Sequence, residues 1–199
     1  MYPFIRLIKE TWKFRSAPEL PIFGEHVSHH ICWPQDIDFW VELNNGRTLT
    51  LYDLGRIPLA RRTGLLNVLR KNSWGLTVAG SSVRYRRRVR PFQRVEMRSR
   101  LAGMDGRFFY VEQSMWRAAE CTSHALYRMA VTDQNGIVAA PKVLSAMGRT
   151  QIMPVLPDWI TAWCDAENLR PWPPMQEPIE GAAANSVHSI PQRNDETAA

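Results

Sequence analysis

The order of periodicities along the chain constrains its fold more than any other feature of the sequence. Residues 26 to 33 alternate as in a β-strand, and from Asn45 the spacing of apolar residues changes to that of a helix. After about Arg70 the alternation returns and continues through four or five strand-like segments. Between these segments, Asp105-Gly106 and Asn135-Gly136 are typical of hairpin turns. The sequence therefore predicts an α+β fold with one early helix and an antiparallel sheet.

The predicted helix contains two residues that bear on its shape. Gly55 lies beside the apolar stripe and would let a strand approach closely. Pro58 has no backbone N–H, so we expect a kink or the start of a new helix there, with a second helical piece running to about Arg70.

Two acids and two amides lie where the first strand pattern gives way to the helix: Asp36, Asp38, Asn44 and Asn45. A carboxylate beside a helix N-terminus suits hydrolysis of an activated acyl group. The acid can attack or direct water, and the free backbone N–H groups can hold the oxygen that becomes negative. Asp and Asn are also common at turns and helix caps, and the spacing alone favours a cap over a catalyst.

The segment Asp36-x-Asp38-x-x-x-Glu42-x-Asn44-Asn45 resembles the D-x-D-x-x-x-H-x-N-N signature of hotdog-fold acyl-CoA thioesterases, in the branch of 4-hydroxybenzoyl-CoA thioesterase. The similarity covers roughly residues 24 to 140, including 51–56 and 83–87. It implies a curved antiparallel sheet wrapped around a long central helix. Glu42 stands where the family often has His, which leaves the local hydrogen bonding and the substrate class open.

The resemblance also implies an activity. An acyl-CoA thioester would be hydrolysed to a free acid and coenzyme A, without a cofactor, in a homodimer or homotetramer whose site lies between subunits. The working acid would be Asp38, as nucleophile or general base, and the backbone N–H of Asn45 would bind the thioester oxygen. We expect Asn44 and Glu42 beside the substrate and Asp36 to orient the loop. A non-catalytic acyl-CoA- or lipid-binding hotdog scaffold is the alternative function, favoured by Glu42 and the unusual tails.

Arginines dominate residues 84 to 90, in a chain with a net charge of +6 and a pI near 9.6. On a strand, the even-numbered ones would share one face; these are Arg84, Arg86, Arg88 and Arg90. Three interpretations remain open: a solvated or paired face, contacts to the phosphates of coenzyme A, and nucleic-acid binding, ranked in that order. We take Arg84, Arg86 and Arg88 as candidate substrate-binding residues and expect no nucleic-acid partner, because no nucleic-acid motif accompanies the run.

The cysteines and histidines predict neither a disulfide framework nor a metal site. Cys32, Cys121 and Cys164 have no C-x-x-C spacing, and we expect reduced thiols in a cytoplasmic protein. Adjacent His29 and His30 point to opposite faces of a strand, so at best two of His26, His29 and His30 lie on one side as ligands of a metal ion.

Extensions flank the predicted hotdog domain at residues 24–150. Residues 1–23 include an amphipathic segment, 4 to 14, which could touch an anionic membrane surface but which we expect to pack on its own domain or on a partner subunit. Neither a signal peptide nor a membrane-spanning stretch is predicted. Residues 151–199 form a Pro- and Trp-rich extension, with a short helix expected at 157–169 and disorder expected from 181.

Overall fold

The computed structural model describes residues 2–149 and 154–175. The chain divides into two compact units, Met1–Leu156 and a second that begins at Pro157. The second unit contains α5 (Asp158–Leu169), where a short helix was predicted. The tail predicted to be disordered lies outside the described residues.

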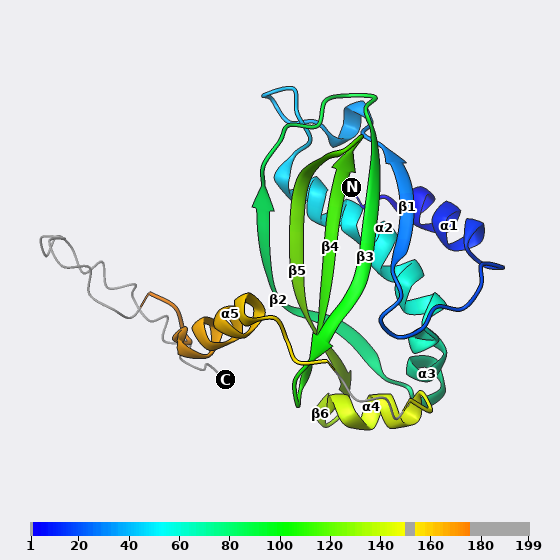
Figure 1. The fold of residues 1–199 in the computed structure, drawn as a ribbon, viewed down its shortest axis with the longest axis vertical. Helices are drawn as coiled ribbons and strands as arrows, with labels where there is room; N and C mark the ends of the chain where they lie inside the picture. Colours follow the sequence, from blue (N-terminus) through cyan, green and yellow to red (C-terminus); the bar gives the residue numbers. More distant parts are fainter. Residues whose placement is uncertain (1, 150–153, 176–199) are drawn as a thin grey trace, which may run out of the picture. The chain divides into compact units, whose positions relative to one another are not determined.

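The first unit is a curled antiparallel sheet packed on one long helix, α2 (Asn45–Arg62) (Figure 1). The sheet order is β1-β3-β4-β5-β2, with β6 paired to β5. Its strands are β1 (His26–Ile31), β2 (Gly75–Tyr85), β3 (Arg94–Met104), β4 (Phe108–Arg117), β5 (Glu120–Asp133) and β6 (Gly136–Val138). The remaining helices are α1 (Phe4–Lys13), the short 3-10 helix η1 (Pro34–Asp36), α3 (Leu65–Asn72) and α4 (Ala140–Ala146). The predicted α+β class and the curved sheet around a central helix are confirmed.

The core lies between α2 and the concave face of the sheet. Leu51, Tyr52 and Leu54 of α2 are fully buried. Gly55 lets the helix approach β3, because a Cβ atom there would lie 2.5 Å from Ser99 Oγ and 2.8 Å from Met97 Sδ. Burying large side chains on this helix face is what fixes it along the sheet.

The sequence predicts a kink or a new helix at Pro58, and the structure rules out the new helix. The helix α2 runs through Pro58 to Arg62, and Gly64, whose φ is +85°, separates it from α3. The second helical piece predicted to run to about Arg70 is therefore present as α3, Leu65–Asn72. A proline removes one backbone donor, but packing of the helix on the sheet can outweigh that local loss.

The two predicted hairpin turns are present. Asp105 Oδ1 accepts hydrogen bonds from the N–H groups of Arg107 and Phe108, each at 2.7 Å, between β3 and β4. Gly136, with φ +114°, follows Asn135 at the turn into β6. Each turn rests on its own few residues, which is why sequence alone could locate it.

The arginine run does not form one strand face, which corrects the sequence prediction. The strand β2 ends at Tyr85, and the N–H groups of Arg86 and Arg87 both donate to Thr122 O, at 2.8 and 3.1 Å. Farther along, Val89 O accepts a hydrogen bond from the N–H of Leu43. After Tyr85 the loop leaves the edge of the sheet and pairs with the segment before α2. Of residues 86 to 90, Val89 alone is buried, so the arginines do not alternate between two faces.

Within the described residues, no helix has the length and apolar character needed to cross a bilayer.

Candidate functional site

The segment before α2 is a small hairpin. Ile37 and Leu43 form an isolated antiparallel bridge. On either side of it, the N–H of Asp38 donates to Glu42 O and the N–H of Asn44 donates to Asp36 O, both at 2.9 Å. The hairpin therefore places Asp36 beside Asn44, just before α2, and leaves Asp38 at its turn.

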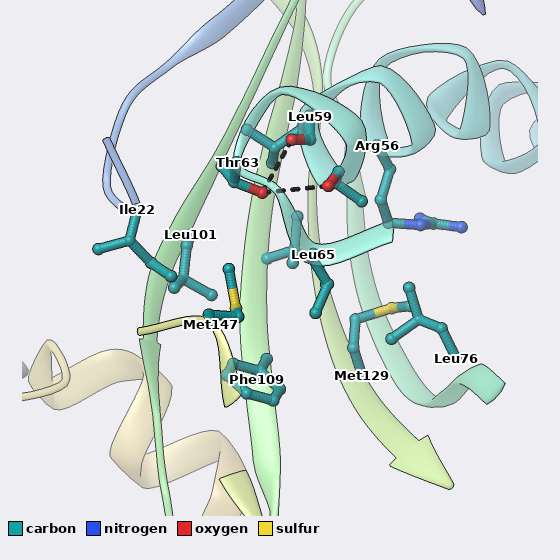
Figure 2. A pocket seen from close by; sticks show the side chains of 12 residues that line it. Ile22, Arg56, Leu59, Thr63, Leu65, Leu76, Leu101, Phe109, Met129 and Met147 are labelled. Atoms are coloured by element: carbon teal, nitrogen blue, oxygen red, sulfur yellow. Dashed lines mark hydrogen bonds between the residues drawn. The ribbon is translucent and has the colours of Figure 1, made fainter. Parts of the chain in front are cut away.

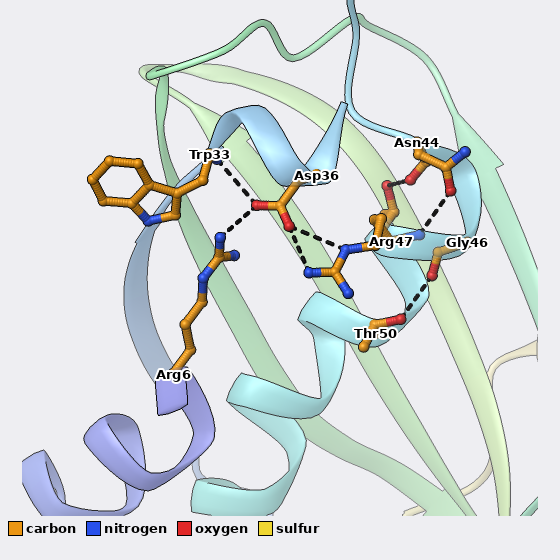
Figure 3. Close-up of polar contacts among 8 residues, drawn as sticks. Arg6, Trp33, Asp36, Asn44, Gly46, Arg47 and Thr50 are labelled. Atoms are coloured by element: carbon orange, nitrogen blue, oxygen red, sulfur yellow. Dashed lines mark hydrogen bonds and ion pairs between the residues drawn. The ribbon is translucent and has the colours of Figure 1, made fainter. Parts of the chain in front are cut away.

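Asp36 is fully buried between two arginines (Figure 3). Its Oδ2 accepts from Arg6 Nη2 at 2.7 Å and from the N–H of Trp33 at 3.0 Å, and its Oδ1 accepts from Arg47 Nη2 at 2.7 Å. One carboxylate thus ties α1, η1 and α2 together, in keeping with the loop-orienting role expected for it. Sequence reasoning missed both arginines, and no local signal points to Arg6, which lies 30 positions away.

Asp38 is half-buried and begins the turn of the hairpin. Its Oδ1 accepts from the N–H of Trp40 at 2.9 Å and lies 3.5 Å from the N–H of Glu42. The Asp38–Glu42 pair is two strand positions beyond the Asp36–Asn44 pair, a step of roughly 7 Å along the backbone. The acid therefore lies near the helix N-terminus without capping it.

The cap is Asn44, whose Oδ1 accepts from the N–H of Arg47 at 3.1 Å. Asn45 and Gly46 are exposed and occupy the first two helical positions, where an N–H has no acceptor within the helix. The hydroxyl of Tyr85 donates to Asn45 O at 3.1 Å, and partial burial raises the pKa of Tyr85, so this donor keeps its proton at neutral pH. The start of α2 is a solvent-accessible, electropositive end.

A cavity of about 220 Å³ lies against this end of the helix. It is lined by Glu42, Leu43, Asn45, Thr48, Tyr85, Arg86, Arg87, Arg88, Val89, Thr122 and Ser123. Arg88 Nε lies 2.8 Å from a carboxylate oxygen of Glu42, and Arg87 pairs with Glu120 at 2.5 Å. The cavity is therefore polar and rich in cations that suit an anionic ligand.

The cavity brings together four of the candidate residues: Glu42, Asn45, Arg86 and Arg88. Asp38 and Asn44 are not among the residues that line it, although both belong to the adjoining hairpin and cap. Arg84 lies on β2 opposite His124 and is exposed. Sequence reasoning missed Thr122 and Ser123, which reach the site through the register of β2 on β5.

A second cavity, of about 50 Å³, lies at the other end of α2 (Figure 2). Aliphatic, aromatic and methionine side chains dominate its lining, among them Ile22, Leu101, Phe109, Met129 and Met147. The hydroxyl of Thr63 in this lining donates to Leu59 O at 3.0 Å, which leaves an apolar surface. Leu59 lies about 20 Å along the helix from Asn45.

Comparisons with known proteins agree on one family. A family model described as the thioesterase-like superfamily matches residues 32–164. Protein THEM6 of Xenopus laevis is 30% identical over 163 residues, covering 80% of this chain and 77% of that protein. Protein THEM6 of Drosophila melanogaster is 28% identical over 142 residues, covering 70% and 72%.

Solved structures show the same fold at low sequence identity. The probable thioesterase YbaW of Escherichia coli has a TM-score of 0.57 at 15% identity, covering 61% of this chain and 98% of that one. A DHNA-CoA thioesterase of Staphylococcus aureus has a TM-score of 0.54 at 11% identity, covering 73% and 92%. These likenesses show a hotdog fold.

Proposed function

Since this chain belongs to the thioesterase-like superfamily, we propose that it hydrolyses an acyl-CoA thioester to a free carboxylic acid and coenzyme A at the N-terminus of α2. One observation carries the proposal: Asn45, whose N–H has no acceptor within α2, lines a cation-rich cavity and directly follows the hairpin that holds Asp38. Several solved structures of the same fold are described as CoA thioesterases, which supports the substrate class.

The thioester oxygen would bind at the backbone N–H of Asn45. Attack on the carbonyl carbon places negative charge on that oxygen, and the helix end stabilises it without having to reorganise. A donor of this kind typically contributes about 2.7–4 kcal/mol in the transition state. The hydroxyl of Tyr85 donates to the carbonyl oxygen of the same residue, which ties the first turn of α2 to the end of β2.

Asp38 would supply the acid. The turn N–H groups hold its Oδ1, which leaves Oδ2 as the atom that acts. As a general base, Asp38 would take a proton from the attacking water. As a nucleophile, it would form an acyl-enzyme anhydride with release of the thiolate, and water would then cleave the anhydride.

The arginine loop would hold the phosphates of coenzyme A. Arg86 and Arg88 line the cavity that Asn45 also lines. Because the pantetheine arm separates the phosphates from the thioester, these arginines would bind the substrate without touching the bond that breaks. Arg88 already contacts Glu42, which would have to share it with the ligand.

Release of free thiol from a panel of acyl-CoA substrates tests this function. The substitution Asp38→Asn should lower turnover by at least about a hundredfold, because the amide keeps the turn acceptor but removes the charge. The matched control is Asp133→Asn, since Asp133 Oδ1 likewise accepts from the N–H two residues on, at 2.8 Å, at a distant turn. Near-normal turnover of Asp38→Asn would show that Asp38 only forms the turn.

The alternative is a non-catalytic acyl-CoA-binding scaffold. The specific observation in its favour is that Glu42 pairs with Arg88 inside the cavity. Retention of acyl-CoA without release of thiol across the whole panel would support this alternative over hydrolysis.

A further inference from the structure

The helix α1 presents an apolar stripe to solvent. Arg6, Leu7 and Glu10 face its own unit, and Glu10 is only 3% exposed. On the opposite side, Phe4, Ile5, Ile8 and Trp12 are 63%, 85%, 67% and 64% exposed. Successive helical residues advance by about 100°, so these four side chains fall within an arc of about 100°. A continuous exposed apolar stripe of this kind marks an interaction surface.

The exposed charges beside the stripe are all positive. Lys9 and Lys13 follow one edge of the helix, and the guanidinium carbon of Arg15 lies 3.9 Å from the centroid of the Trp12 ring. Glu10 is the one acid in residues 1–18, and it is buried. The outer surface of α1 therefore combines bulky apolar groups with cations and carries no exposed carboxylate.

A basic cavity of about 290 Å³ adjoins the helix. It is lined by Arg6, Lys9, Glu10, His29, His30, Ile31, Trp33 and Arg94. The Nη1 atom of Arg6 is buried, and no hydrogen-bond partner for it is present in the described chain. A carboxylate oxygen of Glu10 is buried and unpartnered in the same lining. The side chains that suit a phosphate oxygen are therefore the more exposed cations of the lining, Lys9 and Arg94.

We infer that α1 and the adjoining basic cavity form a docking surface for an anionic phospholipid bilayer. Phe4, Ile5, Ile8 and Trp12 enter between the lipid headgroups, while Lys9, Lys13 and Arg15 contact lipid phosphates, as in helices that lie in the plane of a membrane. A second copy of the chain is a poorer occupant, because a two-fold contact through α1 would bring two cationic faces together without acids to pair them.

Vesicle sedimentation of the full chain tests this surface. The chain should pellet with phosphatidylcholine vesicles that contain phosphatidylglycerol, should bind phosphatidylcholine alone weakly, and should be released by high salt. The double substitution Ile5→Ser with Ile8→Ser should abolish binding. Changing Lys9 and Lys13 to Gln should weaken it by about fivefold per charge.

The matched control is Leu169→Ser on α5, because Leu169 is 85% exposed like Ile5 but belongs to the second unit and not to α1. It should bind vesicles as the parent does. The α1 variants should keep the parent's fold by circular dichroism, since they replace exposed side chains. Equal binding to both kinds of vesicle, or unchanged binding by the double Ser variant, would overturn the inference. Failure of the parent to pellet with anionic vesicles would also overturn it. If, in addition, the double Ser variant had a different mass from the parent by light scattering, α1 would be a protein interface.

Discussion

The two acids of the D-x-D motif occupy opposite environments, although they stand one residue apart. Asp36 is buried between Arg6 and Arg47, whereas Asp38 is half-buried in a turn. Neutralising Asp36 would leave two largely buried cations without their counter-charge. We predict that Asp36→Asn lowers the free energy of unfolding by about 3–5 kcal/mol. Urea denaturation followed by fluorescence measures it, with Asp38→Asn expected to stay within about 1 kcal/mol of the parent. Equal losses in the two variants would contradict this difference.

The buried histidines of β1 predict a pH dependence of stability. Burial lowers the pKa of His26 to about 4 and that of His30 to about 3, from an ordinary value near 6.5. Below pH 6.5 these histidines are protonated in the unfolded chain but stay neutral in the folded chain. The free energy of unfolding therefore falls as the pH falls toward the lowered pKa values. At pH 5 each of the two histidines should lower the free energy of unfolding by about 2 kcal/mol relative to its value at neutral pH.

Denaturation at pH 7.5 and at pH 5 checks this loss. His30→Gln should reduce the difference between the two conditions, since glutamine does not titrate and can still bond to Ser28 Oγ, now 2.9 Å from His30 Nε2. His29→Gln is the control on the opposite face of β1, where the side chain is 66% exposed. A parent whose stability is flat between the two pH values would refute the assignment.

The packing of α2 on the sheet depends on one glycine. Overpacking typically costs about 1–3 kcal/mol, more than the roughly 0.5–1 kcal/mol that alanine gains over glycine in a helix. A methyl group at Gly55 would clash with Ser99 Oγ and Met97 Sδ, so we predict that Gly55→Ala lowers the melting temperature. Gly106→Ala, with no atom within 4 Å of the added Cβ, should be nearly neutral. Calorimetry of both variants measures their melting temperatures. A Gly55→Ala protein at least as stable as the parent would mean that α2 can move away from β3 to make room for the methyl group.

How far sequence reasoning reached depends on whether an element is determined locally. The Asp105-Gly106 turn, the start of α2 and the helix α5 each depend on a few consecutive residues, and all were predicted. The continuation of α2 through Pro58 was not, because tertiary packing decides it. The prediction of a strand after Tyr85 was wrong for the same reason, because the course of the chain there depends on hydrogen bonds to Thr122 and Leu43. In the candidate site, the motif located the hairpin, but its arginine partner on α1 was beyond any local pattern.

At the scale of the whole molecule, β2 leaves one edge of the sheet open. It has 11 residues, and among the described strands it pairs with β5 alone. A long exposed edge of this kind invites pairing with a second copy. Tyr85, the last residue of β2, lines the polar cavity and donates to Asn45 O. A copy paired along β2 would therefore lie next to the candidate site and could contribute residues to it.

We predict that the chain forms a dimer or a larger even oligomer through β2, with both subunits needed for activity. Val78 on this strand is 44% exposed, and Val78→Lys would place a charge in the interface, so the mass from light scattering should fall to that of a monomer and turnover should fall with it. Ile137→Lys on β6 is the matched control, because Ile137 is 39% exposed and lies on a different strand. A parent that is a stable and fully active monomer would refute the prediction. A Val78→Lys protein that stays oligomeric would show that the interface does not lie at β2. A partner subunit would then have to complete the site from another face of the sheet or from α2.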